Sequence, residues 1–314
     1  MDIKVLGSLT VGQGGTSVTP TAPKPRVVLA MLALHPNCVV PVDTLVEELW
    51  GDSGLRTART TIQSYVVHLR KLVSAALPPD DPARRAKEIV VTTPGGYRLD
   101  IAGGEVDVWR FDELAQAGHR ARQEGDFAGV SRNFAAALAS WRGPALVDVQ
   151  QGPHLRVATT RLEEARLNVL DCRIEADLRL GRHHELLGEL AALVARYHTH
   201  EGLYAHYMLA LYRSGRRCEA LEAYRRLRDS LADEQGLEPT PPLRRLQRSM
   251  LAPDRGAAEA TESTYAATAG GRRLASSGAR DGTARTRCIS VELATIPWDA
   301  HDGSAGTRPP LAAG

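Results

Sequence analysis

The sequence lacks the short motifs that many catalytic and metal-binding proteins carry. It contains no G-x-x-x-x-G-K-[ST] phosphate loop and no G-x-S-x-G nucleophile elbow. Its four cysteines are far apart and form no C-x-x-C spacing. The histidines at positions 183, 184, 198, 200 and 206 have no Cys or Glu at metal-ligand spacing, and we interpret them as ordinary exposed side chains. We therefore expect a protein that is not an enzyme and that holds neither a cofactor nor a metal ion.

The chain also lacks the features that would direct it to a membrane. Its longest apolar run, residues 27–34, is far shorter than the roughly 20 residues that cross a bilayer as a helix. Residues 1–6 lack the charged and apolar regions of a signal peptide. These absences predict a cytoplasmic protein that makes no membrane contact.

Acidic residues are missing from one long stretch, residues 53–79, which contains four basic residues. The preceding segment, residues 41–52, has the opposite composition, with four acidic residues and no basic one. The whole chain is nearly balanced, with 39 Lys+Arg and 37 Asp+Glu. Because a basic surface without carboxylates favours a polyanion, this local pattern indicates nucleic acid where the net charge does not.

The N-terminal hundred residues predict a small mixed domain of short strands and helices. Residues 3–11 alternate in polarity and meet a Gly-rich turn at 12–15, which is typical of a hairpin. The apolar spacing then predicts a short strand and three helices, in the order helix 25–34, strand 39–40, helix 43–50 and helix 57–76. Asp43 is expected to cap the second helix and Gly51 to end it.

Helix 57–76 divides into an apolar face and a polar face. Seven residues recur at intervals of three and four and are expected to face the core: Ala58, Ile62, Tyr65, Val66, Leu69, Leu72 and Val73. The opposite face and its edges carry candidate DNA contacts: Arg59, Thr60, Gln63, Ser64, Val67, His68, Arg70 and Lys71. The alternative is a merely solvated polar face, which the absence of acidic residues disfavours.

The chemistry of these side chains suits the edges of DNA bases. Gln63 can pair with adenine, Val67 can meet a thymine methyl group, and Lys71 can reach a guanine edge or a phosphate. The hydroxyl groups of Thr60 and Ser64 can bond bases or phosphates. The arginines at the edges of the helix are better placed for phosphates, which fix register without reading sequence.

A second hairpin is predicted soon after this helix. Strand-like runs at 89–92 and 97–101 flank the turn signal Thr93-Pro94-Gly95-Gly96. The two glycines are expected to permit the turn and a close backbone approach. Tyr97 is expected to pack under the hairpin, and Arg98 to contact the adjacent minor groove or its phosphates. A helix followed by a hairpin is the order of a winged helix-turn-helix.

From Asp107 onward the sequence predicts helices almost throughout. The breaks are expected near Gly125, Gly143, Gly152, Gly181, Gly202 and Gly215. Gly181-Arg182-x-x-Glu185-x-Leu187 recurs 34 residues later as Gly215-Arg216-x-x-Glu219-x-Leu221, which is the period of tetratricopeptide (TPR) repeats. Such stacked hairpins leave a groove that suits a protein or a small ligand. Residues 253–314 are rich in small and polar residues with no apolar period, which predicts disorder.

Several short segments together resemble the SARP family, the Streptomyces antibiotic regulatory proteins, over about residues 1–252. The segments that carry the resemblance are Val5-Leu6-Gly7, Leu45 to Gly51, Thr61 to Lys71, Gly95 to Leu99, Asp107-x-x-x-Phe111, Trp141-Arg142-Gly143-Pro144, Ala220 to Arg228 and Gly236 to Pro239. Each segment is weak alone, whereas their joint order is specific.

The resemblance implies a mainly α fold in three parts. These are an OmpR-type winged helix-turn-helix domain (α+β) at 1–101, an all-α, TPR-like bacterial transcriptional activation domain at 107–252, and the disordered tail at 253–314. It implies an activator of an antibiotic biosynthetic gene cluster that binds promoter direct repeats as a homodimer and recruits RNA polymerase holoenzyme. The residues leave two alternatives open: a TPR-type signalling adaptor, and a repressor with the same fold.

Overall fold

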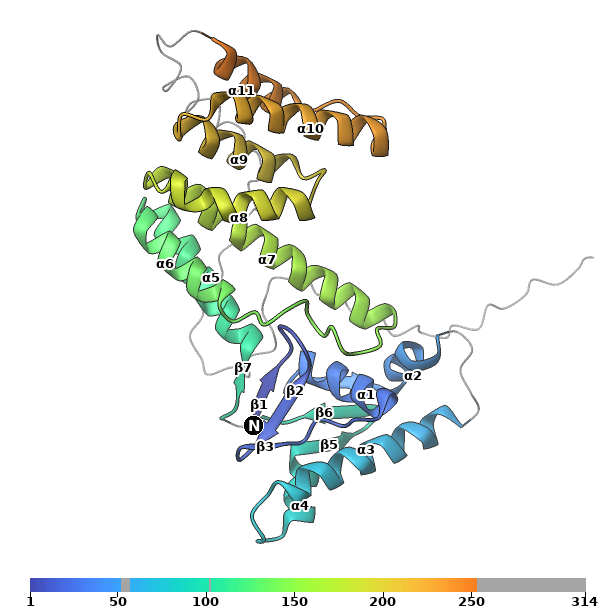
Figure 1. Cartoon of the computed structure of the whole chain (residues 1–314). Coiled ribbons are helices and arrows are strands. Elements are labelled where there is room, and N and C mark those ends of the chain that lie inside the picture. The colour runs from blue at the N-terminus through green and yellow to red at the C-terminus, as the bar shows by residue number, and fades with distance from the viewer. Residues whose placement is uncertain (52–56, 102, 253–314) are drawn as a thin grey trace, which may run out of the picture.

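The structure, a computed structural model, describes residues 1–51, 57–101 and 103–252 (Figure 1). The tail predicted to be disordered, residues 253–314, lies outside the described residues. Figure 1 shows two small sheets and their helices at one end of the molecule and a stack of helices at the other. The predicted mainly α fold, with a winged-helix region followed by a helical domain, is confirmed.

The first sheet joins the N-terminus to the start of the helical half. It contains β1 (Asp2–Lys4), β2 (Thr10–Gln13), β3 (Thr16–Ser17) and β7 (Glu105–Val106), in the order β3-β2-β1-β7. The predicted hairpin is formed by β2 and β3, which are antiparallel. Strand β7 was not predicted, and it pairs in parallel with β1. The chain therefore returns to its N-terminus before the long helices begin.

The helix-turn-helix region follows the predicted order. It consists of α1 (Pro23–Leu34), β4 (Val39–Pro41), α2 (Val42–Trp50) and α3 (Ala58–Ala75). Helix α1 is buried along most of its length. Gly51 ends α2 at a φ of 61°, as predicted. The prediction for Asp43 is wrong, because Pro41 occupies the N-cap position and Asp43 lies in the first turn, where its charge still favours the helix N-terminus.

A helix that was not predicted, α4 (Pro82–Ile89), separates α3 from the second hairpin. The Asp81 carboxylate caps it by accepting the N–H of Arg84 at 3.3 Å, and Pro82 occupies the first turn. An acidic cap followed by Pro is a local helix-start signal, so this helix was within reach of the sequence. Strands β5 (Val90–Thr93) and β6 (Gly96–Leu99) follow and form the second sheet in the order β4-β6-β5.

The rest of the described chain is helical apart from residues 139–152 and short turns. Its helices are α5 (Asp107–Gln123), α6 (Phe127–Leu138), α7 (Pro153–Arg179), α8 (His183–Arg196), α9 (Glu201–Arg213), α10 (Arg217–Gln235) and α11 (Pro241–Leu251). The break predicted near Gly202 lies at residues 197–200, so that Gly202 itself is in the first turn of α9. The 34-residue repeat maps α8 onto α10, and its two glycines have φ values of 79° and 76°.

The turn after each repeat glycine is built alike. Arg182 donates its N–H to the Asp177 carbonyl at 3.0 Å, and Arg216 donates to the Leu211 carbonyl at 2.9 Å. Asp126, which follows Gly125, makes the same bond to Ala121 at 2.9 Å. The hairpin of α5 and α6 therefore uses the turn of the repeats, although its sequence does not share their motif.

Of the five histidines predicted to be exposed, His184 and His198 are exposed, His183 and His200 are half-buried, and His206 is buried. His206 is buried on α9, and its Nε2 lies 2.7 Å from Asp171 Oδ1 on α7. The interpretation as an exposed side chain is therefore wrong for this residue. Nowhere in residues 1–51, 57–101 and 103–252 do three or more His, Cys, Asp or Glu side chains gather as metal ligands would. None of the helices in those ranges is long and apolar enough to cross a membrane.

Three acidic side chains join the sheet end of the molecule to its helical half. The buried Glu48 carboxylate, on α2, accepts the N–H groups of Gly152 at 2.6 Å, His154 at 2.8 Å and Leu155 at 3.2 Å. It thus caps α7 from another part of the chain. Asp107 accepts the N–H groups of Val5 and Leu6, and Asp148 accepts that of Leu9. We call these three residues the carboxylate junction.

Glycines and apolar packing complete the junction. A Cβ atom at Gly152 would collide with the Glu48 carbonyl oxygen, so the chain passes α2 as closely as a backbone can. One continuous core extends from Ile3 to Ala176 and includes residues of both halves. A second core, from Ile174 to Met250, lies within the helical stack. Helix α7 contributes to both cores.

We predict that Glu48→Ala lowers the free energy of unfolding of the full chain by about 3 kcal/mol, because it leaves buried N–H donors of α7 without a charged acceptor. Urea unfolding followed by circular dichroism measures this loss. Glu47→Ala is the matched control, since Glu47 is exposed and forms a surface ion pair with His154, and it should cost less than about 1 kcal/mol. Equal losses in the two variants would contradict the capping role of Glu48.

Candidate nucleic-acid interface

Helix α3 presents one exposed face that is almost free of apolar side chains. Ala58, Ile62, Val66, Leu69 and Val73 are buried, and Tyr65 and Leu72 are half-buried, so the predicted apolar face is confirmed. Seven of the nine candidate DNA contacts are exposed on the other side of the helix: Arg59, Thr60, Gln63, Ser64, Val67, His68 and Lys71. We call these seven residues the α3 face.

The position of α3 follows from its neighbours. The apolar face of α3 packs on α1 and α2. The helix ends at Ala75, before Pro78 and Pro79. Figure 1 shows α3 along the outer edge of the sheet end, away from the helical stack. The α3 face is therefore open to a large partner.

Polar side chains on the α3 face make few bonds to the rest of the molecule. Arg59 Nη2 lies 2.8 Å from Asp43 Oδ1 of α2, and both side chains are more than two-thirds exposed, at 71% and 80%. Ser64 donates its hydroxyl to the Thr60 carbonyl within the helix. An exposed ion pair contributes little to stability, so a phosphate can replace Asp43 as the partner of Arg59 at small cost.

Arg70 lies apart from the α3 face. Its side chain is half-buried, and its Nε and Nη2 donate to the Val90 carbonyl oxygen at 2.9 and 2.6 Å. Nη2 also donates to Thr92 Oγ1 at 2.7 Å. Burial lowers the pKa of the guanidinium from its ordinary value. Arg70 therefore ties α3 to strand β5, a role that its position in the sequence did not indicate.

The hairpin of β5 and β6 has the construction that its glycines predict. Gly95 adopts a φ of 79°, which favours glycine, and its carbonyl accepts the N–H of Val42 at 2.9 Å. A Cβ atom at Gly96 would collide with the Val40 carbonyl oxygen of β4. Tyr97 is buried beneath the hairpin, as predicted, and this burial raises its pKa. The hairpin, or wing, is thus fixed against β4 and the start of α2.

Arg98 lies on the central strand of the second sheet. It is half-buried, and its Nη2 lies 3.2 Å from Asp100 Oδ2. Its backbone is paired with Val39 on one side and Val91 on the other, so it is not at the tip of the wing. The structure therefore groups seven of the nine candidate residues on the α3 face and separates Arg70 and Arg98 from it.

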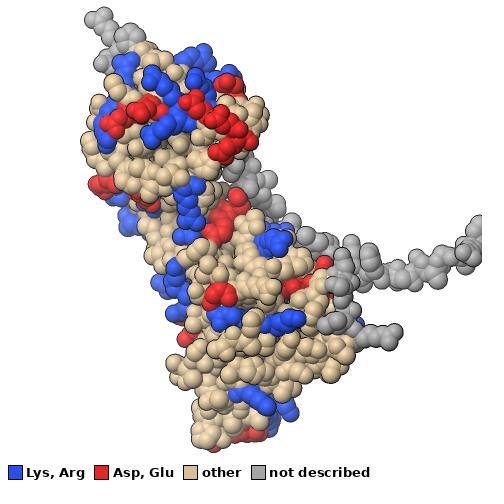
Figure 2. Space-filling model, turned by 45° about the vertical axis from the view of Figure 1, so that its right-hand side comes forward, with Lys and Arg blue, Asp and Glu red and all other residues tan. Residues whose placement is uncertain are grey.

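Helix α4 adds basic side chains that sequence analysis missed. Arg84, Arg85 and Lys87 are all exposed, and α4 packs on α3. Arg84 forms an ion pair with Glu88 one turn later at 3.2 Å. The helical stack shows basic and acidic side chains side by side at the top of Figure 2. Within the described part of the chain, Lys87 has no carboxylate at ion-pair distance, so its charge is available to a polyanion next to α3.

Comparison with known proteins gives the same two-part division. The family description "Transcriptional regulatory protein, C terminal" matches residues 16–99, and "Bacterial transcriptional activator domain" matches residues 106–251. The chain is similar to the regulatory protein DnrI of Streptomyces peucetius, at 46% identity over 256 residues, covering 82% of this chain and 94% of DnrI.

Two further relatives are longer than the region that they share with this chain. The transcriptional regulatory protein EmbR of Mycobacterium tuberculosis is 37% identical over 251 residues, which cover 80% of this chain and 63% of EmbR. The regulatory protein AfsR of Streptomyces coelicolor is 35% identical over 261 residues, covering 83% of this chain and 25% of AfsR.

A solved structure of Mycobacterium tuberculosis EmbR, in complex with a low-affinity phosphopeptide, resembles the fold with a TM-score of 0.72 at 35% identity. The match covers 85% of this chain and 70% of that one. The arrangement of sheets and helices described above is thus shared with an experimentally determined relative.

We predict that Arg70→Lys loosens the wing, because an ammonium group keeps the charge but cannot reproduce the forked bonds to Val90 and Thr92. Amide hydrogen exchange in residues 90–99 should become faster, and the free energy of unfolding should fall by about 1 kcal/mol. Arg59→Lys on the same helix is the control and should leave exchange in the wing unchanged. Unaltered exchange in Arg70→Lys would show that other contacts hold the wing.

Proposed function

The chain belongs to the SARP family of transcriptional regulators, and on this basis we propose that it activates an antibiotic biosynthetic gene cluster by binding specific DNA sequences in its promoter. It acts in the cytoplasm, binds direct repeats as a homodimer and recruits RNA polymerase holoenzyme. The observation that carries the proposal is the α3 face, which is exposed, contains no acidic residue and lies beside the wing.

The dimensions of α3 suit the major groove of DNA. A helix of 18 residues is about 27 Å long, and a groove about 12 Å wide admits one such helix. The α3 face offers an amide, two hydroxyls, an apolar methyl pair and cations, the groups that distinguish base edges and bind phosphates. Its neighbours α2 and the wing lie where they can rest on the backbone of the duplex.

We assign the residues of the α3 face by their chemistry. Gln63 pairs with an adenine, Val67 meets a thymine methyl group, and Lys71 reaches a guanine edge or a phosphate. Thr60, Ser64 and His68 bond bases or phosphates within their reach. Arg59 exchanges Asp43 for a phosphate. Arg70 acts through the wing that it holds, and Arg98 contributes positive charge near the adjacent minor groove.

The two ends of the molecule divide the proposed work. Residues 1–101 form the DNA-binding domain, and residues 107–252 form the activation domain. Figure 1 shows that the helical stack points away from α3. The stack is therefore accessible to the polymerase while α3 lies on DNA. The mixed charges of the stack in Figure 2 suit a protein surface better than a polyanion.

We predict that Gln63→Ala relaxes the preference for one base pair by about 1–3 kcal/mol, because a bidentate contact to adenine is lost. Binding sites selected from a random duplex pool by the wild-type chain provide the probe, and single-base variants of that site give the specificity profile. Lys71→Ala should weaken binding in the same assay. Gln123→Ala, an exposed glutamine on α5, is the control and should leave the profile unchanged. Profiles of Gln63→Ala and Lys71→Ala identical to wild type would contradict the assignment of α3.

A reporter gene under the bound promoter tests the direction of regulation. Deletion of the gene that encodes this chain should lower expression of the reporter, because an activator brings polymerase to the promoter. A rise in expression would favour a repressor with this fold. A phenotype that persists in a variant without DNA binding would favour a signalling adaptor.

A further inference from the structure

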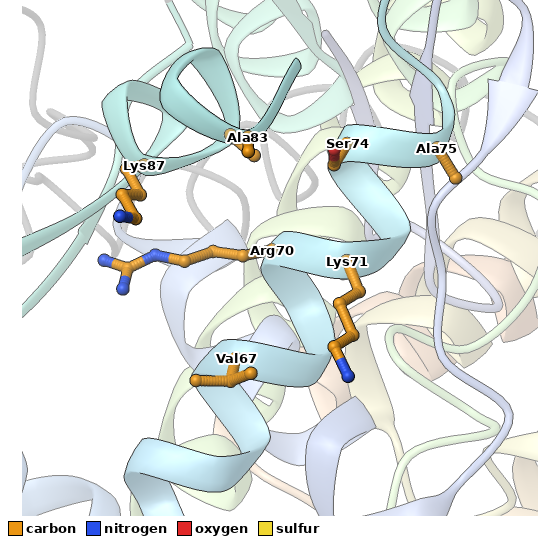
Figure 3. Close-up of a pocket in the computed structure, with 8 residues that line it drawn as sticks. Val67, Arg70, Lys71, Ser74, Ala75, Ala83 and Lys87 are labelled. Carbon is orange, nitrogen blue, oxygen red and sulfur yellow. The ribbon is translucent and has the colours of Figure 1, made fainter. Parts of the chain in front are cut away.

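A groove of about 420 Å³ lies between α3 and α4, beside the α3 face (Figure 3). Val67, Arg70 and Lys71 line it from α3, and Ala83, Ala86 and Lys87 line it from α4. Figure 3 shows Arg70 and Lys87 extending toward the same side of the groove, from opposite walls. Two residues of the α3 face, Val67 and Lys71, are therefore also walls of this groove.

The groove carries three cations and no acidic residue among its lining side chains. Within the described part of the chain, neither Lys71 nor Lys87 has a carboxylate within ion-pair distance, and the nearby Glu88 pairs with Arg84. Arg70 is held in place by Val90 and Thr92, so it cannot move away from Lys87 at small cost. Cations gathered without an acidic partner repel one another, and a bound anion removes that repulsion.

The walls of the groove also limit the shape of its occupant. Alanine lines much of the α4 side, which leaves room for a flat or ring-shaped group between the helices. Val67 is half-exposed, at 50%, and offers an apolar contact at the point where the groove meets the α3 face. A polymer in which apolar rings alternate with anionic groups fits a groove that has small apolar walls and a cationic rim.

We propose that this groove seats the sugar–phosphate backbone of one DNA strand, with Lys87 binding one phosphate on the side to which Arg70 extends, Lys71 binding another, and a deoxyribose facing Ala83 and Val67. The assignment rests on the proposed function, since the groove is continuous with the α3 face. It makes α4 a second DNA-contacting helix, in which Lys87 positions the duplex without reading sequence.

The test measures DNA binding by the full-length chain over a range of salt concentrations. The probes are a fluorescently labelled duplex selected from a random pool by the wild-type chain and a scrambled duplex of the same composition. Lys87→Gln should weaken binding to both duplexes by the same factor, about threefold, and should reduce the slope of log affinity against log salt by about one.

Two further variants separate a contact in the groove from a general loss of charge. Arg245→Gln removes one exposed charge from α11, in the helical stack, and should leave the salt slope unchanged. Ala83→Leu fills the groove without changing the charge and should weaken binding to both duplexes. Circular dichroism and urea unfolding verify that each variant is folded.

The outcomes distinguish this proposal from the one on which it rests. If the wild-type chain binds the selected duplex and both Lys87→Gln and Ala83→Leu bind as wild type does, the groove assignment is overturned and the proposed function stands. If the wild-type chain binds neither duplex, both are overturned. If Lys87→Gln lowers reporter expression while DNA binding is unchanged, a protein occupies the groove instead, and the assignment is again overturned.

Discussion

The capping of α7 by Glu48 determines how the sheet end and the helical stack are oriented. The carboxylate comes from α2, whose Asp43 also holds Arg59 of α3, so one short helix contacts both the candidate reading helix and the start of α7. A buried carboxylate satisfies the N–H groups at a helix N-terminus and is favoured by its dipole. Because Asp107 and Asp148 accept further N–H groups, from the N-terminal segment at Val5 and Leu9, the two halves are joined at more than one point.

Because the junction is fixed, α7 connects the sheet end rigidly to the helical stack. The helix has 27 residues, about 40 Å, and it belongs to the core of the sheet end at its start and to the core of the stack at its end. The two cores meet at Ile174 and Ala176, on one helix, without an intervening linker. Under the proposed function, a partner bound to the stack is held at a defined distance and angle from DNA on α3, as recruitment to a promoter requires.

The parts of this fold that local patterns govern could be predicted from the sequence. The apolar period of α3, the glycines of the wing and the repeat turns at Gly181 and Gly215 all depend on residues close in the chain. The signal for helix α4 was equally local, because the pair Asp81-Pro82 marks its start, but this signal was overlooked. The role of Glu48 was not within reach, because the N–H groups that donate to it lie 104 to 107 residues away, and the sequence alone indicates a solvated acidic residue on α2. The same holds for Arg70 and His206, whose partners are set by packing.

The basic side chains of the sheet end fall into two groups. Some are bonded within the protein, and the charge of the others is available to a phosphate. Arg70 and Arg98 are half-buried and bonded within the sheet end, where their charge stabilises the wing. Among the residues that the structure describes, no carboxylate pairs with Lys71 or Lys87, and Arg59 pairs with the exposed Asp43, which a phosphate can replace. The uncharged Gln63 and Ser64 lie between these available cations along α3. Since cations supply affinity at any sequence and amides discriminate among bases, the proposed function implies that substitutions at Gln63 can change which sequence is bound with little change in overall affinity.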